Sequence, residues 1–179
     1  MTAAVLCPGP SLALLPGERA FSFKVGVNRA VTVGGCEWFV KMDEHQFADL
    51  RSHAPYAITT AETLRRLRNR EPDYTCGVVE TLATDVPPSL GWRIFSATIA
   101  IVLAHALGAT TIEVWGADMR GDADFDGARD PANRRDEARW KCERSILGKL
   151  IRWLRRRGIK VRRYGIARHC SRQRRCISG

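Results

Sequence analysis

The sequence predicts an α/β fold, in which a mostly parallel sheet carries helices on both faces and is followed by a basic C-terminal helix and tail. Short apolar segments of strand length alternate with segments of helical periodicity, which is the pattern of parallel β-α-β units. The length of 179 residues suits one domain with a substantial core. Its 45% hydrophobic and 27% charged residues are typical of a globular protein and argue against global disorder.

Strands dominate the first third of the predicted fold. From the N-terminus, apolar and β-branched segments predict strands over residues 3–7, 23–27, 37–42 and 56–59. The first of these runs directly into the turn 8–12, which opens a helix. A short helix is expected over residues 45–52, with Phe47 and Leu50 facing inward.

Helices dominate the following part of the chain. Thr60 is a good N-cap for a helix over residues 61–70, whereas residues 71–89 contain Pro72, Pro87 and Pro88 and are expected to form mostly loop. A strongly apolar helix is predicted over residues 92–107, and Gly108 would end it.

The C-terminal part begins with a β-branched strand over residues 111–115. A polar loop follows, then a long amphipathic helix over residues 134–157 and a last strand over 159–163. Trp140 and Glu143 share one face near the start of that helix. They either pack as structural residues or close a ligand site.

The loop between residues 118 and 133 is the most acidic part of the chain. Its segment 122–127 matches the opening of an EF-hand, but Asn133 stands at the twelfth position in place of a bidentate Glu. We interpret it as a solvated loop. The alternative is a loosely held divalent cation that bridges carboxylates and ligand phosphates. No residue is assigned as a metal ligand.

Cysteine usage and the N-terminus bear on the compartment. The six cysteines form no C-x-x-C pair, so we expect free thiols in a reducing environment. Cys170 and Cys176, with His169, would supply only half of a zinc site. The N-terminus lacks the basic start of a signal peptide, and no run approaches the roughly 18 uncharged apolar residues of a membrane span. These features predict a cytoplasmic protein without a membrane partner.

The first predicted strand ends in a bend formed by Gly9, Pro10 and Ser11. Glycine lets the backbone approach a ligand closely, and the free N–H groups at the start of a helix attract anions. The Ser11 hydroxyl could cap the helix or reach a phosphate. The segment matches neither G-x-G-x-x-G nor a P-loop, so an ordinary turn is the alternative to an anion site.

Polar residues follow the other predicted strands as well. Asn28 can offer a donor and an acceptor to a base or a sugar, with a turn residue as the alternative. Asp43 could act as a base, hold a ribose or cap a helix, while Gly116 and Asp118 close the late strand. Because ligands of such folds bind at the carboxyl ends of the strands, we expect these residues to share a site.

Positive charge is concentrated at the C-terminal end. The net charge of +10 originates in residues 134–179, which hold 17 Lys and Arg against 3 Asp and Glu, whereas the first 133 residues are net negative. Such a block often contacts a polyanion, and a solvated face is the alternative. The residues predicted to bind nucleic acid are Arg155, Arg156, Arg157, Arg162 and Arg163.

A resemblance to a known group of proteins begins at the first bend. The bacterial sialyltransferases that use CMP-sialic acid have a nucleotide loop, Gly-Asn-Gly-Pro-Ser-Leu, which is similar to residues 5–12 (Val-Leu-Cys-Pro-Gly-Pro-Ser-Leu). The same loop occurs in a Rossmann-like group that includes motility-associated glycosyltransferases and archaeal hydroxymethylpterin pyrophosphokinases. Residues 25–28, 38–43 and 112–119 resemble later strands of this group, the last with a Gly-x-Asp ending. Small uncharacterised phage proteins with Gly-x-Asp-Met and Arg-Trp-x-x-Glu segments look similar.

The resemblance covers residues 3–165 as short islands. It implies a single Rossmann-like nucleotide-binding domain over residues 1–165, with a basic, flexible tail over 166–179. The nucleotide-site set that it carries over is Gly9, Pro10, Ser11, Asn28 and Asp118, to which we add the adjacent Gly116. Two features depart from the group, since Pro8 replaces the Asn of the loop and no histidine matches the general base of the sialyltransferases.

Together these observations predict a nucleotide-dependent transferase, in the first place a glycosyltransferase with a nucleotide-sugar donor. In a direct displacement, the N–H groups of Gly9 and Ser11 would hold the donor phosphate, and Asn28 would contact the base or the sugar. Asp43 or Asp118 would orient or deprotonate an acceptor hydroxyl as the catalytic residue. The basic segment would guide a polyanionic acceptor, such as hydroxylated bases of phage DNA in the host cytoplasm.

Two other functions fit the same residues. A non-catalytic nucleic-acid or nucleotide-binding protein would keep the shell of the site and use its arginines for phosphate contact. A Mg²⁺-dependent phosphoryl or pyrophosphoryl transferase acting on a small molecule would use the acidic segment 122–130. Nucleotide release with an acceptor, DNA binding without release, and ATP consumption with Mg²⁺ distinguish the three. The sequence predicts no oligomeric state.

Overall fold

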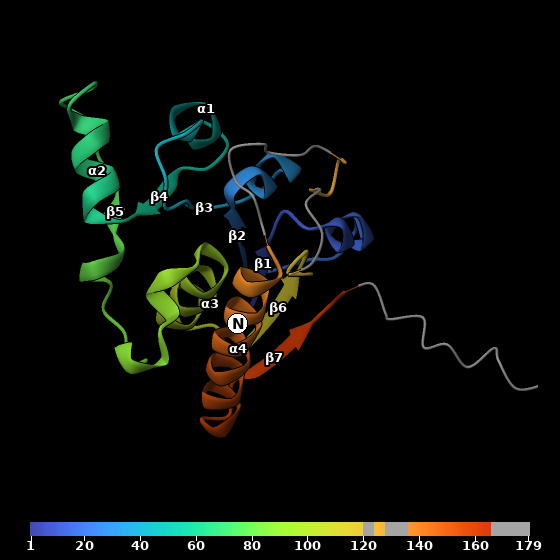
Figure 1. Cartoon of the computed structure of the whole chain (residues 1–179). Coiled ribbons are helices and arrows are strands. Elements are labelled where there is room, and N and C mark those ends of the chain that lie inside the picture. The colour runs from blue at the N-terminus through green and yellow to red at the C-terminus, as the bar shows by residue number, and fades with distance from the viewer. Residues whose placement is uncertain (120–123, 128–135, 166–179) are drawn as a thin grey trace, which may run out of the picture.

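The sheet of this protein is parallel throughout, as a computed structural model that describes residues 1–119, 124–127 and 136–165 shows. Across these described residues, seven strands form one sheet in the order β5-β4-β3-β2-β1-β6-β7 (Figure 1). The strands are β1 (Thr2–Leu6), β2 (Phe23–Val27), β3 (Trp38–Val40), β4 (Tyr56–Thr59), β5 (Gly77–Val78), β6 (Thr111–Trp115) and β7 (Lys160–Arg163). The predicted α/β class is confirmed.

The helices differ more from the prediction than the strands do. The α-helices are α1 (Phe47–Arg51), α2 (Ala61–Arg68), α3 (Ser96–Ala106) and α4 (Glu137–Arg156). Short 3₁₀ segments are η1 (Pro10–Leu14), η2 (Asn28–Val33), η3 (Val79–Thr81), η4 (Pro88–Leu90) and η5 (Trp92–Ile94). The helix expected after the first bend is therefore only the 3₁₀ segment η1. The predicted loop 71–89 contains the edge strand β5.

The predicted helix over residues 92–107 is divided into two pieces. Phe95 has extended backbone angles between η5 and α3, so the α-helix begins only at Ser96. Its end agrees with the prediction, because Gly108 follows with a φ of 86°, a left-handed conformation that suits glycine. The chain direction therefore changes at Phe95, beside the carboxyl ends of the strands.

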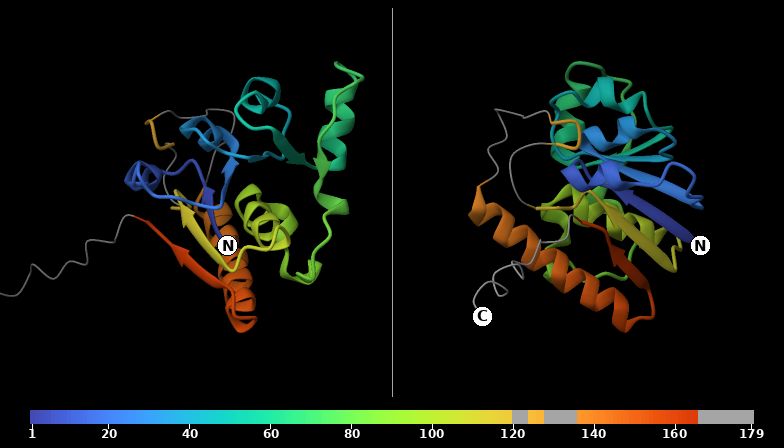
Figure 2. Two further views of the ribbon diagram at one scale, coloured as in Figure 1. Left: turned by 180° about the vertical axis from the view of Figure 1, so that it is seen from behind. Right: turned by 90° about the vertical axis from the view of Figure 1, so that its right-hand side faces the viewer.

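One face of the sheet is covered by the two longest helices, α3 and α4 (Figure 2). All eight residues from 97 to 104 in α3 are buried, so this helix lies inside the molecule. Apolar side chains that alternate along the strands, such as Val5, Val25 and Val114, face it. The amphipathic α4 lies beside α3 and buries Leu147, Leu150 and Leu154 in the same core.

The opposite face is covered by shorter segments. Leu12 of η1, Val31 of η2 and Phe47 of α1 pack there against alternate strand residues such as Leu6. Further along the sheet, Trp115 stacks on a tyrosine after β7 with ring centroids 3.8 Å apart. Helical segments thus lie on both faces, as predicted.

The strand order places a switch point next to β1. From β1 the chain proceeds to β2, β3, β4 and β5 on one side, and then returns to place β6 and β7 on the other side. β1 therefore pairs with both β2 and β6, and all three strands end at the same edge of the sheet. Folds of this kind bind ligands outside such a point.

Some predictions fall on parts of the chain outside the description. The basic tail over 166–179, with His169, Cys170 and Cys176, lies outside the described residues, and so do Asp122, Asp130 and Asn133 of the acidic loop. Within the described ranges, no helix combines the length and the apolar character needed to cross a membrane.

Candidate functional site

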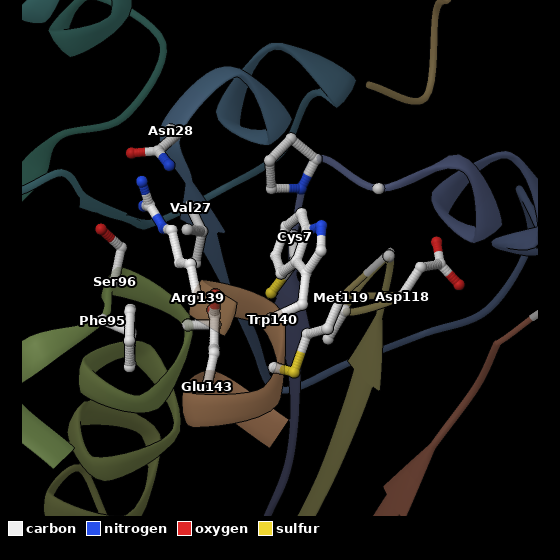
Figure 3. Close-up of a pocket in the computed structure, with 15 residues that line it drawn as sticks. Cys7, Val27, Asn28, Phe95, Ser96, Asp118, Met119, Arg139, Trp140 and Glu143 are labelled. Atoms are coloured by element: carbon white, nitrogen blue, oxygen red, sulfur yellow. The ribbon is translucent and has the colours of Figure 1, made fainter. Parts of the chain in front are cut away.

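A pocket lies at the carboxyl ends of β1, β2 and β6, at the switch point of the sheet (Figure 3). It is lined by residues 7–9, 27–28, 95–97 and 116–119, and by Arg139, Trp140 and Glu143 of α4. The starts of α3 and α4 therefore meet the ends of three strands around one space. Segments that are far apart in the sequence come together here, as the strand order requires.

The structure brings only part of the predicted set into this pocket. Gly9, Asn28, Gly116 and Asp118 are among the lining residues. The remaining three predicted residues, Pro10, Ser11 and Asp43, do not line it. The contacts of these seven residues, both inside and outside the pocket, indicate which of them are available to a ligand.

The bends after β1 and β6 touch at two glycines. The N–H of Gly9 donates to the carbonyl oxygen of Gly116 over 2.8 Å. A Cβ on Gly9 would lie 2.3 Å from that oxygen, and a Cβ on Gly116 would lie 1.9 Å from the carbonyl oxygen of Cys7. Gly116 also has a φ of 71°, which disfavours other residues. Glycine is required at both positions by the approach of one chain segment to another.

Ser11 and Asp118 fasten the same two bends together. The Ser11 N–H donates to Oδ2 of Asp118 over 2.7 Å. The Ser11 hydroxyl is buried, accepts from the Gly116 N–H at 3.2 Å and lies 3.4 Å from the carbonyl oxygen of Tyr164. The N–H groups of Gly9 and Ser11 thus donate within the protein, which differs from the anion cradle expected from the sequence. In Figure 3 the Asp118 carboxylate points away from Asn28.

Asn28 lines the pocket and has a side-chain oxygen without a hydrogen-bond donor in the described part of the chain. It follows β2 with a φ of 50°, in the left-handed region that Asn tolerates better than most residues. Its Oδ1 atom is buried and accepts no hydrogen bond from any described residue. A buried acceptor without a donor costs roughly 1–3 kcal/mol. A ligand N–H or O–H at this point of the pocket would remove that cost.

The start of α4 carries two of the charged side chains of the pocket, Arg139 and Glu143. Asp136 caps the helix, and its side chain accepts from the Arg139 N–H over 2.7 Å. In Figure 3 the Arg139 side chain extends towards the end of the pocket where Asn28 and Ser96 lie. A cation at this end gives the pocket the means to bind a phosphate. The sequence had placed Arg139 at the helix start without indicating this direction.

Glu143 and Cys7 also line the pocket, with different chemical capacity. Glu143 lies one helical turn after Arg139. It is largely buried, with only 8% of the residue exposed to solvent. Burial raises the pKa of the Cys7 thiol strongly, and the nearby Glu143 raises it further. The thiol therefore stays protonated at neutral pH. Cys7 has no capacity to act as a thiolate nucleophile.

Asp43 lies outside the pocket, after β3. Its carboxylate is paired with the ammonium of Lys41, with Oδ1 and Nζ 2.6 Å apart. The Lys41 side chain is buried, whereas that of Asp43 is more than half exposed. Asp43 thus lies apart from the pocket that Asp118 lines, and the catalytic role predicted for one or the other stays a prediction.

The described part of the acidic loop, residues 124–127, is attached next to the first bend. The N–H of Phe125 donates to the carbonyl oxygen of Pro8 over 2.7 Å. Arg29 forms ion pairs with Asp124 and with Asp126. These two carboxylates face an arginine, and no cluster of three or more metal-ligating side chains occurs among the residues that the structure describes.

Three of the arginines predicted to bind nucleic acid, Arg155, Arg156 and Arg157, lie at the C-terminal end of α4, where Arg157 is the C-cap, and none of them lines the pocket. Arg155 donates to the carbonyl oxygen of Val161 over 2.7 Å. The Arg157 guanidinium lies 3.9 Å from the centre of the Trp153 ring, and its Nε is 3.3 Å from Oδ2 of Asp85. Both side chains therefore join structural elements to one another.

The two predicted arginines of β7 also have partners within the chain. Arg162 lies 3.7 Å from Oε1 of the buried Glu113. Arg163 donates to the carbonyl oxygen of Ala117, next to the second bend. Desolvation lowers the pKa of the Arg163 guanidinium below its ordinary value. Nucleic-acid binding by these arginines stays a prediction.

Comparisons with known proteins find a likeness among solved structures. No protein-family model matches the sequence, and no curated protein matches it. Solved structures of the sialyltransferase CstII from Campylobacter jejuni do match. The complex with the substrate analogue CMP-3FNeuAc has a TM-score of 0.55 at 14% identity, over 90% of this chain and 80% of that chain.

Two further complexes of this sialyltransferase agree. The complex with cytidine-5'-monophosphate has a TM-score of 0.57 at 14% identity, over 90% of this chain and 79% of that chain. The complex with a trisaccharide acceptor and CMP has a TM-score of 0.55 at 13% identity, over 91% of this chain and 80% of that chain. The chain therefore has the Rossmann-like α/β fold of a sialyltransferase structure.

Proposed function

We propose that this protein is a glycosyltransferase that binds a nucleotide-sugar donor in the pocket at the switch point. The observation that carries the proposal is the buried Oδ1 of Asn28, which has no donor among the described residues and belongs to the pocket lining. The likeness to a sialyltransferase with CMP or a donor analogue supports this reading. A nucleoside offers N–H and O–H groups of the kind that Asn28 would accept.

Different residues of the pocket would contact different parts of the donor. Asn28 would recognise the base or the ribose, with the hydroxyl of Ser96 at the same end of the pocket. The Arg139 guanidinium would neutralise the donor phosphate. In a direct displacement the phosphate leaves with the electron pair of the bond to the sugar, so a fixed cation stabilises the developing charge. Gly9 and Gly116 would form the closely packed wall against which the donor lies.

For the acceptor we propose a hydroxyl group on a polyanion. The support is the charge of the C-terminal segment, where residues 134–179 hold most of the excess of basic residues. Hydroxylated bases of DNA are one acceptor of this class. Electrostatic steering raises the rate of encounter and leaves the chemistry of transfer to the pocket.

The test is nucleotide binding with a variant of Asn28. A thermal-shift and calorimetry panel of CMP, UDP, GDP and ADP with their sugars should identify a ligand that stabilises the protein, by about 2.7 kcal/mol at a hundred times its Kd. Asn28→Gly removes the side chain and still permits the left-handed backbone. We expect it to weaken binding about tenfold, which corresponds to about 1.4 kcal/mol.

The matched control is Asn69→Gly, at the exposed C-cap of α2. Binding should survive in this variant. If the panel contains no ligand, or if both variants bind like the wild type, the proposed site is wrong. Nucleotide binding without release from any nucleotide sugar would identify a binding protein. ATP consumption that requires Mg²⁺ would identify a phosphoryl or pyrophosphoryl transferase instead.

A further inference from the structure

We infer that Glu143 is the general base of the transfer reaction, an inference that rests on the proposed function. In a direct displacement the acceptor hydroxyl must lose its proton as its oxygen attacks the sugar. A side chain that accepts this proton has to line the pocket in which the donor lies. The described residues of the pocket include few groups that could do so.

The other candidates are removed by their contacts. The carboxylate of Asp118 accepts the Ser11 N–H and points away from the Asn28 end of the pocket. The Cys7 thiol is held in its protonated form, because burial raises its pKa. Asp43 is not part of the pocket lining. By these contacts and positions all three are placed less favourably than Glu143 to take a proton from an acceptor beside the donor.

Histidine does not supply the base within the described chain either. His45 and His53 do not line the pocket. His105 lies in α3, with its Nε2 atom 2.9 Å from Oδ1 of Asp85. This pair is outside the pocket lining. Among the described lining residues, Glu143 is therefore the carboxylate that remains for proton transfer.

Glu143 and Arg139 lie on the same face of α4 and would act on the two substrates together. Residues four apart on a helix lie on the same face, one turn from each other. Arg139 and Glu143 both line the pocket, so one helix face presents a cation and a carboxylate to the same space. In Figure 3 Glu143 is drawn between Phe95 and Met119, below the end where Asn28 lies. The donor phosphate and the acceptor would thus be served by successive turns of α4.

The step balances without a further reactant. The Glu143 carboxylate takes the proton of the acceptor hydroxyl while the hydroxyl oxygen forms a bond to the anomeric carbon. The bond between that carbon and the donor phosphate oxygen breaks, and the phosphate leaves with the electron pair. Arg139 neutralises the charge that develops there. The proton leaves Glu143 to solvent after product release.

The experiment compares Glu143→Gln with Glu137→Gln. Both changes neutralise a carboxylate in the first two turns of α4, but Glu137 is exposed and is paired with Arg144. Nucleotide release from a panel of nucleotide sugars is measured with three kinds of acceptor: water, simple saccharides and DNA that contains hydroxylated bases. We expect E143Q to lower the rate about a hundredfold or more, as loss of a general base does. Nucleotide affinity should change less than about threefold, and E137Q should behave as the wild type.

Two further measurements separate chemistry from folding. Glu143→Ala should recover part of its rate when formate is added, because a free carboxylate can occupy the space of the lost one. The wild-type rate should fall at acid pH as the base is protonated, and E143Q should lose this dependence. Melting temperatures of all variants with bound nucleotide control for misfolding.

The outcomes distinguish the two proposals. A wild-type protein that releases nucleotide while E143Q keeps a rate within about threefold would overturn the base assignment and leave the glycosyltransferase intact. An E143Q defect that formate does not repair in E143A, with unchanged pH dependence, would also overturn it. A wild type that binds nucleotide and releases none would overturn transfer and base together, but not the nucleotide site.

Discussion

At the residue scale, the contact between Gly9 and Gly116 explains why both bends contain glycine. The sequence analysis singled out both positions as part of a nucleotide site, where the backbone would approach a ligand. The structure shows that each glycine makes room for the other bend. Because the partner of Gly9 is more than a hundred residues away in the chain, local sequence contains no sign of this contact. Ser11 is buried because it lies between the two bends, where its hydroxyl accepts a hydrogen bond from the Gly116 N–H.

The first prediction concerns Gly116→Ala. A methyl group at this position meets the Cys7 carbonyl oxygen, and the positive φ adds strain. We expect the free energy of unfolding to fall by about 2–4 kcal/mol. Gly158→Ala is the control, because Gly158 has a φ of 82° and no atom within 4 Å of a Cβ. It should cost roughly 1–2 kcal/mol. Denaturant unfolding measures both, and equal losses would disprove the role of the contact.

At the scale of the element, α4 connects folding with the site. Its sequence predicted an amphipathic helix, and most of its apolar positions are buried as expected. Its first two turns, with Arg139, Trp140 and Glu143, form part of the pocket. The sequence left open whether these residues pack or close a ligand site. Helical periodicity identifies a shared face, but only the packing of α4 against the strand ends decides what that face meets.

The second prediction compares two helix caps. Asp136→Ala removes the cap of α4, and Thr60→Ala removes the cap of α2, where the side chain accepts from the Thr63 N–H. Each should cost about 1 kcal/mol of stability. Only D136A should weaken nucleotide binding, because the freed first turn of α4 carries Arg139. Calorimetry with the nucleotide found in the panel checks this, and an equal effect of T60A would contradict it.

Strands proved easier to predict than helix starts. β2, β4 and β6 have the bounds that the sequence predicts, because short runs of apolar and β-branched residues are flanked there by clear turn residues. The start of α3 was placed four residues too early, since apolar character continues through Trp92–Ile94 while the backbone is extended at Phe95. β5 was missed because a two-residue edge strand has almost no pattern of its own.

At the scale of the whole molecule, the strand order creates the pocket. The alternation of elements indicated a parallel sheet with a site at the carboxyl ends of its strands. The bends after β1 and β6 do lie side by side at that edge of the sheet. The order of the strands in the sheet could not be predicted from the sequence. The pairing of β1 with β6 brings Asn28 and Asp118 near the same space and leaves Asp43 at another strand end. Of the two alternative catalytic residues predicted from the sequence, Asp118 therefore lines this pocket and Asp43 does not.

The third prediction concerns the basic end of α4. Arg155, Arg156 and Arg157 lie about 20 Å along the helix from Glu143, at about 1.5 Å per residue. Changing all three to Gln should lower DNA affinity and flatten its salt dependence, if this segment contacts a polyanion. Donor turnover with a small acceptor should stay within about threefold of the wild type. The control variant carries the same change at Arg65, Arg66 and Arg68 of α2.

That control matches the number of charges removed from one helix. Salt titrations of binding to duplex and single-stranded DNA measure the slopes. Equal slopes for both triple variants and the wild type would leave the arginines of α4 as structural contacts. Melting temperatures are needed beside them, because Arg155 and Arg157 bridge elements of the fold.

The central place of β1 also constrains biosynthesis. Its two neighbours are β2, which leaves the ribosome soon afterwards, and β6, which ends only at Trp115. Until then one side of β1 has no partner, and an unpaired strand can add to other chains. The pairing of the interior strand β1 is thus completed late in translation. Aggregation competes with folding during that interval, before the finished protein exists.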